Sequence, residues 1–243
     1  MKSKNKNNIL DNIKTLIYAI LIAFFIRTFI LQPFTIPSGS MLPNLLVGDY
    51  LFVSKYSYGY SRYSLPFSPN IFEGRVFKKQ PKRGDVVVFR LPKDPSIDYI
   101  KRIVGLPGDE IIIVNGTIHI NDGVIEQAQS KNKDKYFSDY PKRSLLIEKI
   151  PQKSYNILNL EDNGIGDNTG VYVVPKDHYF FMGDNRDNSL DSRFLDQVGY
   201  VSYDNLIGRA EFLFFSSDKS IPLWRFWEWH KKFRADRIFK KIK

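Results

Sequence analysis

The sequence predicts a mostly β protein, in which a single N-terminal transmembrane helix precedes an antiparallel β-sheet domain with an inserted smaller β lobe. One long apolar run lies near the N-terminus, and short runs of Val, Ile, Phe and Tyr recur between residues 45 and 215. Such β-branched and aromatic runs favour strands. Hydrophobic residues make up 43% and aromatic residues 15% of the 243 residues, which is enough to build a core and excludes a disordered chain.

The apolar run Ile13–Leu31 predicts the membrane helix. Its 19 residues extend about 28 Å as a helix, which just spans a bilayer core. Residues 1–12 are rich in lysine, so we expect them on the cytoplasmic side. A cleaved secretory signal has the same layout, but no small-x-small cleavage site follows Leu31. We therefore expect an uncleaved single-pass signal-anchor that leaves residues 33–243 on the outer, extracytoplasmic face of the cytoplasmic membrane.

Residues 33–106 and 171–215 are expected to form the β core. Strand patterns occupy residues 45–53, 86–89, 99–104, 171–174, 178–182, 198–201 and 207–215. Residues 107–170 predict an inserted lobe that begins with a hairpin, because Asn115-Gly116 supplies the two positive-φ positions of a type I′ turn. Residues 56–82 are aromatic and basic and are punctuated by Pro, Gly and Ser, which indicates a long loop or an extended hairpin.

The net charge of +10 indicates an anionic partner. Nucleic acid and a lipid surface both fit this charge. The basic residues cluster at the ends expected to face the membrane, and no nucleic-acid motif occurs, so we predict lipid contact and no nucleic acid. Residues 216–243 form a basic aromatic C-terminal tail, whose pattern suits a headgroup surface as well as a partly disordered, solvated tail.

The segment Pro33–Asp49 reads PFTIPSGSMLPNLLVGD and begins where the apolar run ends. Its prolines stop a helix, and Gly39 allows close backbone approach. Ser38 and Ser40 flank that glycine and offer two hydroxyls, so the segment suits a displayed nucleophile with hydrogen-bond donors beside it. A linker between membrane helix and folded domain is the alternative. The chain has no cysteine, which excludes thiolate catalysis, disulfides and Cys-ligated zinc.

Lys101 is the best candidate base for a serine nucleophile. Alternation along its strand places it with Tyr99, on the face opposite Ile100. Burial there would lower the pKa of the amine, and a neutral amine can take a serine proton. An ordinary lysine that points outward is the alternative. A Ser-His-Asp triad is disfavoured, because none of the three histidines lies in a patterned context: His119, His178 and His230.

The run Gly183–Arg193, GDNRDNSLDSR, invites a calcium-loop interpretation. With Asp184 at the first position an arginine occupies the third, and with Asp187 first a serine stands where the loop needs glycine. The run therefore predicts a network of Asn and Asp turns, braced by arginines, that fixes the side chain of Ser189. We predict no metal and no cofactor.

Three segments together resemble the sequence boxes of bacterial type I signal peptidase, the leader peptidase family with a Ser/Lys dyad. They are PSGSMLPNLLVGD (37–49), YIKRIVGLPGD (99–109) and GDNRDNSLDSR (183–193), and RGDVVVF (83–89) resembles a fourth box. They follow an N-terminal anchor, in the family's order. The resemblance implies a mostly antiparallel β-domain with an inserted lobe. It also implies a membrane-anchored serine endopeptidase that cleaves signal peptides from exported preproteins.

The resemblance further implies a role for each residue of the site. Ser40 would be the nucleophile and Lys101 its general base. Ser38 would assist the oxyanion beside the backbone N–H of Ser40, and Ser189 would orient the amine. Three residues would brace the site: Asp191, Arg193 and Arg102. Four would line shallow pockets for small substrate side chains: Phe34, Ile36, Val88 and Ile100. A non-catalytic, membrane-tethered scaffold that binds anionic lipid remains the alternative, although a scaffold needs neither hydroxyls nor a buried amine.

Overall fold

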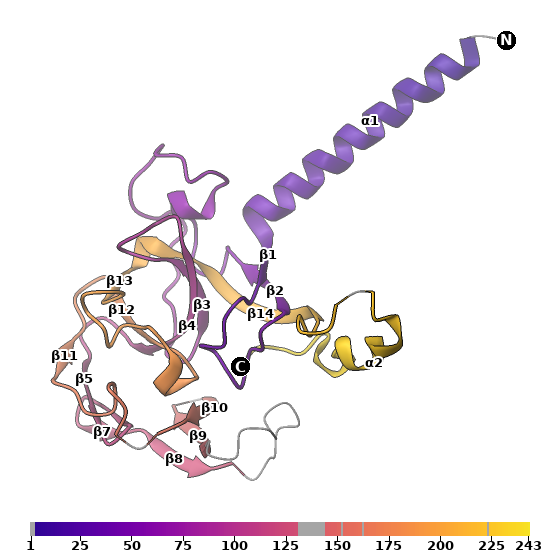
Figure 1. Cartoon of the computed structure of the whole chain (residues 1–243). Helices are drawn as coiled ribbons and strands as arrows, with labels where there is room; N and C mark the ends of the chain where they lie inside the picture. The colour runs from indigo at the N-terminus through magenta and orange to yellow at the C-terminus, as the bar shows by residue number, and fades with distance from the viewer. Residues whose placement is uncertain (1–2, 131–143, 152, 162, 223) are drawn as a thin grey trace.

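A computed structural model of the chain has one long N-terminal helix that projects from a body of three antiparallel sheets (Figure 1). The structure describes residues 3–130, 144–151, 153–161, 163–222 and 224–243. The sheets are antiparallel throughout these residues, so the predicted mostly β fold class is confirmed.

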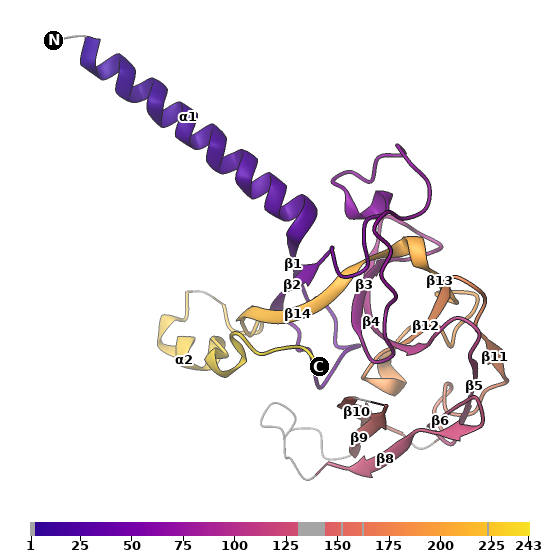
Figure 2. The ribbon, with the colours of Figure 1, turned by 180° about the vertical axis from the view of Figure 1, so that it is seen from behind.

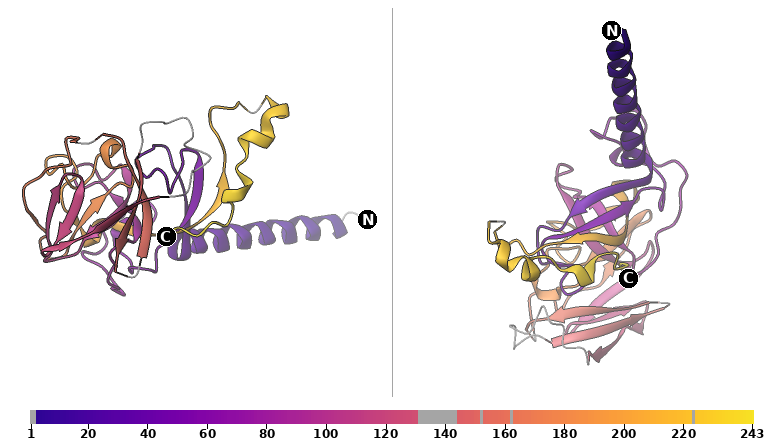
Figure 3. Two further views of the ribbon diagram at one scale, coloured as in Figure 1. Left: turned by 90° about the horizontal axis from the view of Figure 1, so that it is seen from below. Right: turned by 90° about the vertical axis from the view of Figure 1, so that its right-hand side faces the viewer.

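Helix α1 (Ser3–Phe25) continues through a π-helical turn (Ile26–Ile30) into strand β1 (Leu31–Thr35). The helix begins earlier than the expected residue 13, because the lysine-rich flank contains no proline or glycine to stop it. The π-helical turn ends at Ile30, one residue before the expected end of the membrane helix at Leu31, because Leu31 pairs with Ser54 in the sheet. The segment Ile9–Ile30 is long and apolar enough to cross a membrane, with a mean hydropathy of 2.0. Figure 3 shows α1 standing clear of the body.

The largest sheet has seven strands in the order β1-β2-β14-β3-β4-β12-β13. The strands that follow β1 are β2 (Asp49–Ser54), β3 (Val86–Arg90), β4 (Asp98–Gly105), β12 (His178–Met182), β13 (Val201–Ser202) and β14 (Leu206–Ser216). The strand patterns at 86–89, 99–104, 178–182 and 207–215 are confirmed. These strands could be predicted because the central strands are buried on both faces, so their sequences are apolar.

Two smaller sheets form the inserted lobe. One has the order β11-β5-β6-β7 and contains β5 (Glu110–Val114), β6 (Thr117–Ile120), β7 (Gly123–Val124) and β11 (Tyr172–Val173). The other has the order β10-β9-β8, with β8 (Glu126–Gln129), β9 (Ser144–Ile150) and β10 (Lys153–Asn159). The predicted hairpin turn is confirmed, since Asn115 and Gly116 have φ of 48° and 72°. Figure 2 shows the lobe on the side of the body away from α1.

The lobe is joined to the large sheet by a shared apolar core. Val104 of β4 and Phe180 of β12 pack in one cluster with Ile111, Ile118 and Ile157 of the lobe, and Phe180 and Ile111 are fully buried. Burial of this kind stabilises by roughly 25 cal/mol per Å² of apolar surface. The lobe is therefore held against the strands that carry the site.

The loop between β2 and β3 contains a 3-10 turn (Arg62–Ser64) and a single bridge between Tyr60 and Val76. Arg75 anchors it, with 5% of its surface exposed and its guanidinium donating to the carbonyls of Gly59 and Tyr203. Residues 56–82 are thus mostly an ordered loop.

The sequence predicts a C-terminal tail that either contacts lipid headgroups or is partly disordered and solvated. The last third of the tail instead packs on the protein. After η5 (Phe226–Glu228), α2 (Trp229–Lys232) and η6 (Ala235–Arg237), the chain returns to the large sheet, where Lys241 bridges to Phe212. Arg237 is only 1% exposed. The turn around Trp224–Trp229 keeps large exposed aromatic side chains, and Phe239, at 77% exposure, is a further one. The return of the chain to the large sheet could not be predicted from local pattern, because it depends on the ion pair between Arg237 and Asp49, which are 188 residues apart. Two further 3-10 turns are η3 (Arg186–Asn188) and η4 (Tyr203–Asn205).

Candidate active site

Ser40 lies in the turn between β1 and β2, and Asn185 holds its backbone. The Asn185 N–H donates to the Ser40 carbonyl (3.1 Å), and its side-chain amide donates to the Gly39 carbonyl (2.9 Å). Within the described residues, neither the Ser40 N–H nor the Ser38 hydroxyl has a hydrogen-bond partner. Two donors beside the Ser40 hydroxyl therefore remain available to a substrate oxygen.

Lys101 lies in the middle of β4, and its Nζ is 2.5 Å from Ser40 Oγ. The residue is only 4% exposed, and Nζ lies 5.4 Å from the centre of the Tyr99 ring on the same face of the strand. Burial lowers the pKa of Lys101 to about 8, although the charges of Asp191 and Asp184 act in the opposite direction. At pH 7 about one amine in ten is then neutral, against about one in three thousand for an ordinary lysine.

A cleft of about 660 Å³ opens above this pair. Its walls come from the loop 37–40, from residues 97–101 and from the loop 187–190 with Phe194. No histidine lines the cleft. The four predicted pocket residues lie in one apolar cluster, where Val88 is paired with Ile100 across the β3–β4 ladder and Phe34 packs beside Ile36. Of the four, Ile100 reaches the cleft itself, so the cleft floor is apolar beside the two reactive groups.

Ser189 lines the same cleft but makes no hydrogen bond to Lys101 here. The residue is 6% exposed, and its Oγ is buried without a hydrogen-bond partner among the described residues. A buried unpaired hydroxyl costs about 1–3 kcal/mol. Gly183 makes the packing possible, since a Cβ there would lie 2.1 Å from Ser189 Oγ and 2.6 Å from the Ser40 carbonyl oxygen. The structure thus brings Ser189 to the site and leaves its hydroxyl free for a partner.

Two buried ion pairs brace the loops around the site. Arg193 donates from Nε and Nη2 to the Asp191 carboxylate at 2.8 and 3.0 Å, and Arg102 donates to both Asp184 oxygens at 2.7 Å. Burial alone would raise the pKa of Asp191, but Arg193 more than offsets it and holds that pKa below its usual range. Bidentate pairs fix geometry as well as charge, and the three residues predicted as braces all take part in these two pairs.

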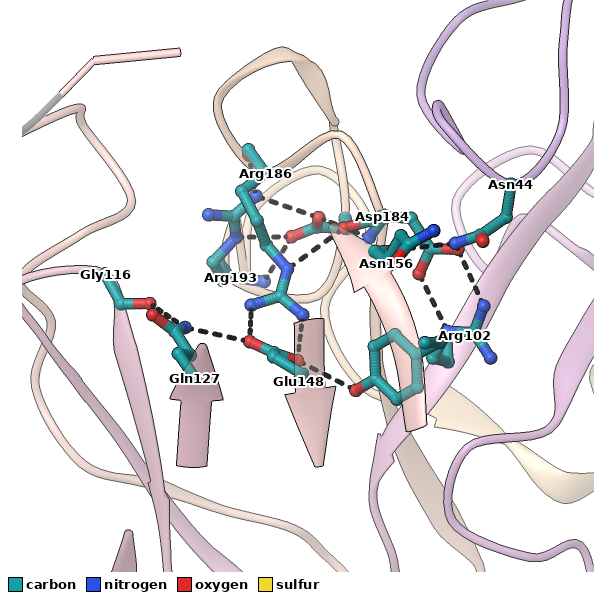
Figure 4. Close-up of polar contacts among 12 residues, drawn as sticks. Asn44, Arg102, Gly116, Gln127, Glu148, Asn156, Asp184, Arg186 and Arg193 are labelled. Carbon is teal, nitrogen blue, oxygen red and sulfur yellow. Dashed lines mark hydrogen bonds and ion pairs between the residues drawn. The ribbon is translucent and has the colours of Figure 1, made fainter. Parts of the chain in front are cut away.

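Sequence reasoning missed a third ion pair, which links the lobe to the Gly183–Arg193 loop. Arg186 forms a bidentate pair with Glu148 of β9, and Glu148 also accepts from the Tyr155 hydroxyl at 2.9 Å and from Gln127 at 3.0 Å (Figure 4). Glu148 is fully buried. It was missed because it lies in a polar stretch that the pattern predicts to be peripheral.

A fourth pair, also missed, joins the C-terminal tail to the segment that follows Ser40. Arg237 donates to the two Asp49 carboxylate oxygens at 3.1 and 2.6 Å and to the Asn44 carbonyl at 2.9 Å. The Asn44 amide in turn donates to Asp184 at 2.7 Å (Figure 4). A continuous polar network therefore runs from the tail to Arg102, the neighbour of Lys101.

Sequence comparisons with known proteins agree with one another. Residues 9–215 match the family model described as "Signal peptidase, peptidase S26". A protein of Rickettsia typhi named signal peptidase I is 40% identical over 99% of this chain and 96% of its own length, and its counterpart in Rickettsia akari is 41% identical over 93% and 90%. A crystal structure of a signal peptidase I from Enterococcus faecalis is 23% identical, with a TM-score of 0.33 over 54% of this chain and 97% of that one.

Proposed function

Because this chain belongs to the signal peptidase family, peptidase S26, we propose that it is a membrane-anchored serine endopeptidase that cleaves N-terminal signal peptides from exported preproteins. One observation carries the proposal of a Ser/Lys dyad: a buried amine with a lowered pKa lies 2.5 Å from the hydroxyl of Ser40, on the floor of an open cleft. A hydroxyl needs such a neighbouring base to become a nucleophile.

The geometry suits acyl transfer. Neutral Lys101 accepts the Ser40 proton while Oγ attacks the scissile carbonyl, and the resulting ammonium returns that proton to the leaving amine. The acyl-enzyme is then hydrolysed by a water that Lys101 deprotonates, and Ser40 regains its proton. The Ser40 N–H and the Ser38 hydroxyl stabilise the oxyanion in both steps, and one such donor contributes about 3 kcal/mol to lowering the barrier.

Supporting residues keep the two reactive groups in place. In this proposal Ser189 orients the amine during the reaction, and Arg102, Asp191 and Arg193 hold the loops that carry the site. The apolar cluster of Phe34, Ile36, Val88 and Ile100, which reaches the cleft through Ile100, accepts the small side chains that precede the cleavage site.

Membrane attachment is the second part of the proposal. The apolar segment Ile9–Ile30 supports a single-pass anchor, and the lysine-rich N-terminus supports a cytoplasmic orientation with the catalytic domain on the outer face of the cytoplasmic membrane. The exposed aromatic turn at Trp224–Trp229, flanked by basic residues, supports an additional contact of the tail with lipid.

The dyad is tested with the full chain in detergent and a preprotein substrate. We expect Ser40→Ala to abolish cleavage, because the nucleophile is lost, and to leave the chain folded, because the removed hydroxyl faces the open cleft. Ser220→Ala, at an exposed serine of the tail, is the control and should cleave normally. If Ser40→Ala cleaved the preprotein within about tenfold of the unmodified rate, the assignment of the nucleophile would be wrong.

A further inference from the structure

A second cavity, of about 410 Å³, lies where the membrane helix meets the β body, and it shares no residue with the cleft at Ser40. Three cations line it from three different segments: Arg27, Lys55 and Arg90. Its apolar wall includes Phe24, Phe67 and Ile207, and none of the described residues that line it is acidic. The cavity thus combines a cationic side with an apolar side.

The three cations are poorly neutralised by the protein. Arg90 is paired with Asp98 at 3.0 Å, yet its Nε is buried without a hydrogen-bond partner among the described residues. Over the same residues, Arg27 has no ion pair, and Lys55, which is 2% exposed, has only the Ser64 carbonyl. Burial and then the charges of Arg27 and Arg90 lower the pKa of Lys55 to about 8, with Asp98 acting against them.

Three cations around one cavity are unfavourable unless an anion binds among them. Like charges near a desolvated lysine repel each other in a low-dielectric site. Among the described residues, Asp98 alone offsets the three cations. Guanidinium groups are suited to phosphate oxygens, which they bind through paired N–H donors. The charge pattern therefore indicates a phosphate-bearing ligand, and the apolar wall indicates that the ligand also carries a hydrocarbon part.

The position of the cavity indicates the source of that ligand. Phe24 and Arg27 lie near the C-terminal end of the apolar segment Ile9–Ile30, where α1 joins the body (Figure 1). If the helix spans the bilayer as proposed above, this end lies at the depth of the outer headgroups. A free phosphate would bind the cations but would make no apolar contact with Phe24 and Phe67.

We propose that this cavity binds the headgroup phosphate of an anionic phospholipid, with Arg27 and Arg90 as its donors and the apolar wall against the start of an acyl chain. Lys55 supplies positive charge behind them. The lipid would fix the angle between the anchor and the catalytic domain. The inference rests on the membrane anchor of the proposed function and is independent of the Ser40–Lys101 chemistry.

The test counts lipids on the full chain. The protein in neutral detergent is offered equimolar phosphatidylglycerol and phosphatidylcholine, and retained lipids are identified by native mass spectrometry. We expect one retained phosphatidylglycerol per chain, preferred about tenfold or more over phosphatidylcholine, and a loss of that preference in Arg27→Gln and in Arg90→Gln. Lys231→Gln removes an exposed lysine of the tail and should keep the preference.

Three results would overturn the inference: equal retention of the two lipids by the unmodified chain, an equal loss in Lys231→Gln, or displacement of the lipid by millimolar inorganic phosphate, which would identify the free anion as the ligand. Preprotein cleavage in lipid-free detergent reports folding and should change less than about twofold in the Arg27 and Arg90 variants. If one variant fails to fold, the other decides. A chain that cleaves preprotein but shows no lipid preference contradicts this inference alone, whereas an unmodified chain that never cleaves contradicts the proposed function.

Discussion

Lys101 and Arg102 are neighbours on β4, and the strand turns them to opposite faces. Both are buried cations, at 4% and 1% exposure. Lys101 meets a serine hydroxyl and an open cleft, whereas Arg102 meets a carboxylate that it binds through two hydrogen bonds. Burial lowers the pKa of Lys101, but for Arg102 the Asp184 carboxylate outweighs burial and the pKa rises. The surroundings of these two adjacent residues thus move their pKa values in opposite directions.

The contrast between a cation that is paired with a carboxylate and one that is not also holds for the other buried cations around the site. Arg186, Arg193 and Arg237 are each buried and each paired with a buried carboxylate. Lys101 lies next to Ser40, and among the residues that the structure describes this buried cation has no carboxylate within ion-pair distance. A paired cation keeps its charge and holds loops together, and an unpaired one can lose its proton near neutral pH. In the proposed mechanism, this division separates the base from the braces.

The largest effect should follow from making the base permanently charged. Lys101→Arg keeps the cation but cannot deprotonate, so we expect the rate of preprotein cleavage to fall by about 10⁴-fold, at the upper end of general-base effects. The fall should appear in kcat, measured with a purified preprotein. A variant that retained a tenth of the activity would show that Lys101 acts through its charge instead of its basicity.

A smaller but still large effect should follow from removing a brace. Asp184→Asn leaves Arg102 buried without its counter-charge, and we expect the free energy of unfolding to fall by roughly 3–5 kcal/mol. Denaturant titration of the full chain in detergent measures it. Glu126→Gln is the matched control, since it breaks an exposed pair with Lys149 (3.3 Å) and should change stability by less than about 1 kcal/mol. Equal losses in the two variants would refute the distinction between buried braces and surface pairs.

The smallest effect tests whether the tail positions the nucleophile. Arg237→Lys keeps the charge but replaces the planar fork, which donates to both Asp49 oxygens and to the Asn44 carbonyl, with a single nitrogen. We therefore expect kcat to fall about tenfold while KM stays nearly constant. Arg225→Lys, in an exposed pair with Glu228 (3.6 Å), is the control and should behave normally. A change in stability without a change in kcat would mean that Arg237 is only structural.

The sequence predicts the parts of this molecule that depend on local pattern. The hairpin at Asn115-Gly116 follows from turn chemistry, and the strands around Val86 and Phe180 follow from continuous apolar runs. The approach of Ser40 to Lys101 was predicted through the family resemblance and not through spacing, because 61 residues separate them.

The parts that escaped prediction depend on partners far apart in the chain. Glu148 and Arg186 are 38 residues apart, and Asp49 and Arg237 are 188 apart. A charged residue is usually solvated, so nothing in the local pattern distinguishes these four from surface charges. Asn185 was read as one member of a turn, although its amide clamps the backbone at Gly39.

The most direct measurement is the pKa of Lys101 itself. Isotope-labelled lysine side chains can be titrated by NMR in the full chain in detergent, with Lys101→Arg used to assign the signal. The account predicts a midpoint near pH 8, and a preprotein cleavage rate that rises about tenfold per pH unit below that midpoint and levels off above it, because the neutral amine is the active form. A midpoint near the usual lysine value of about 10.4 would contradict it.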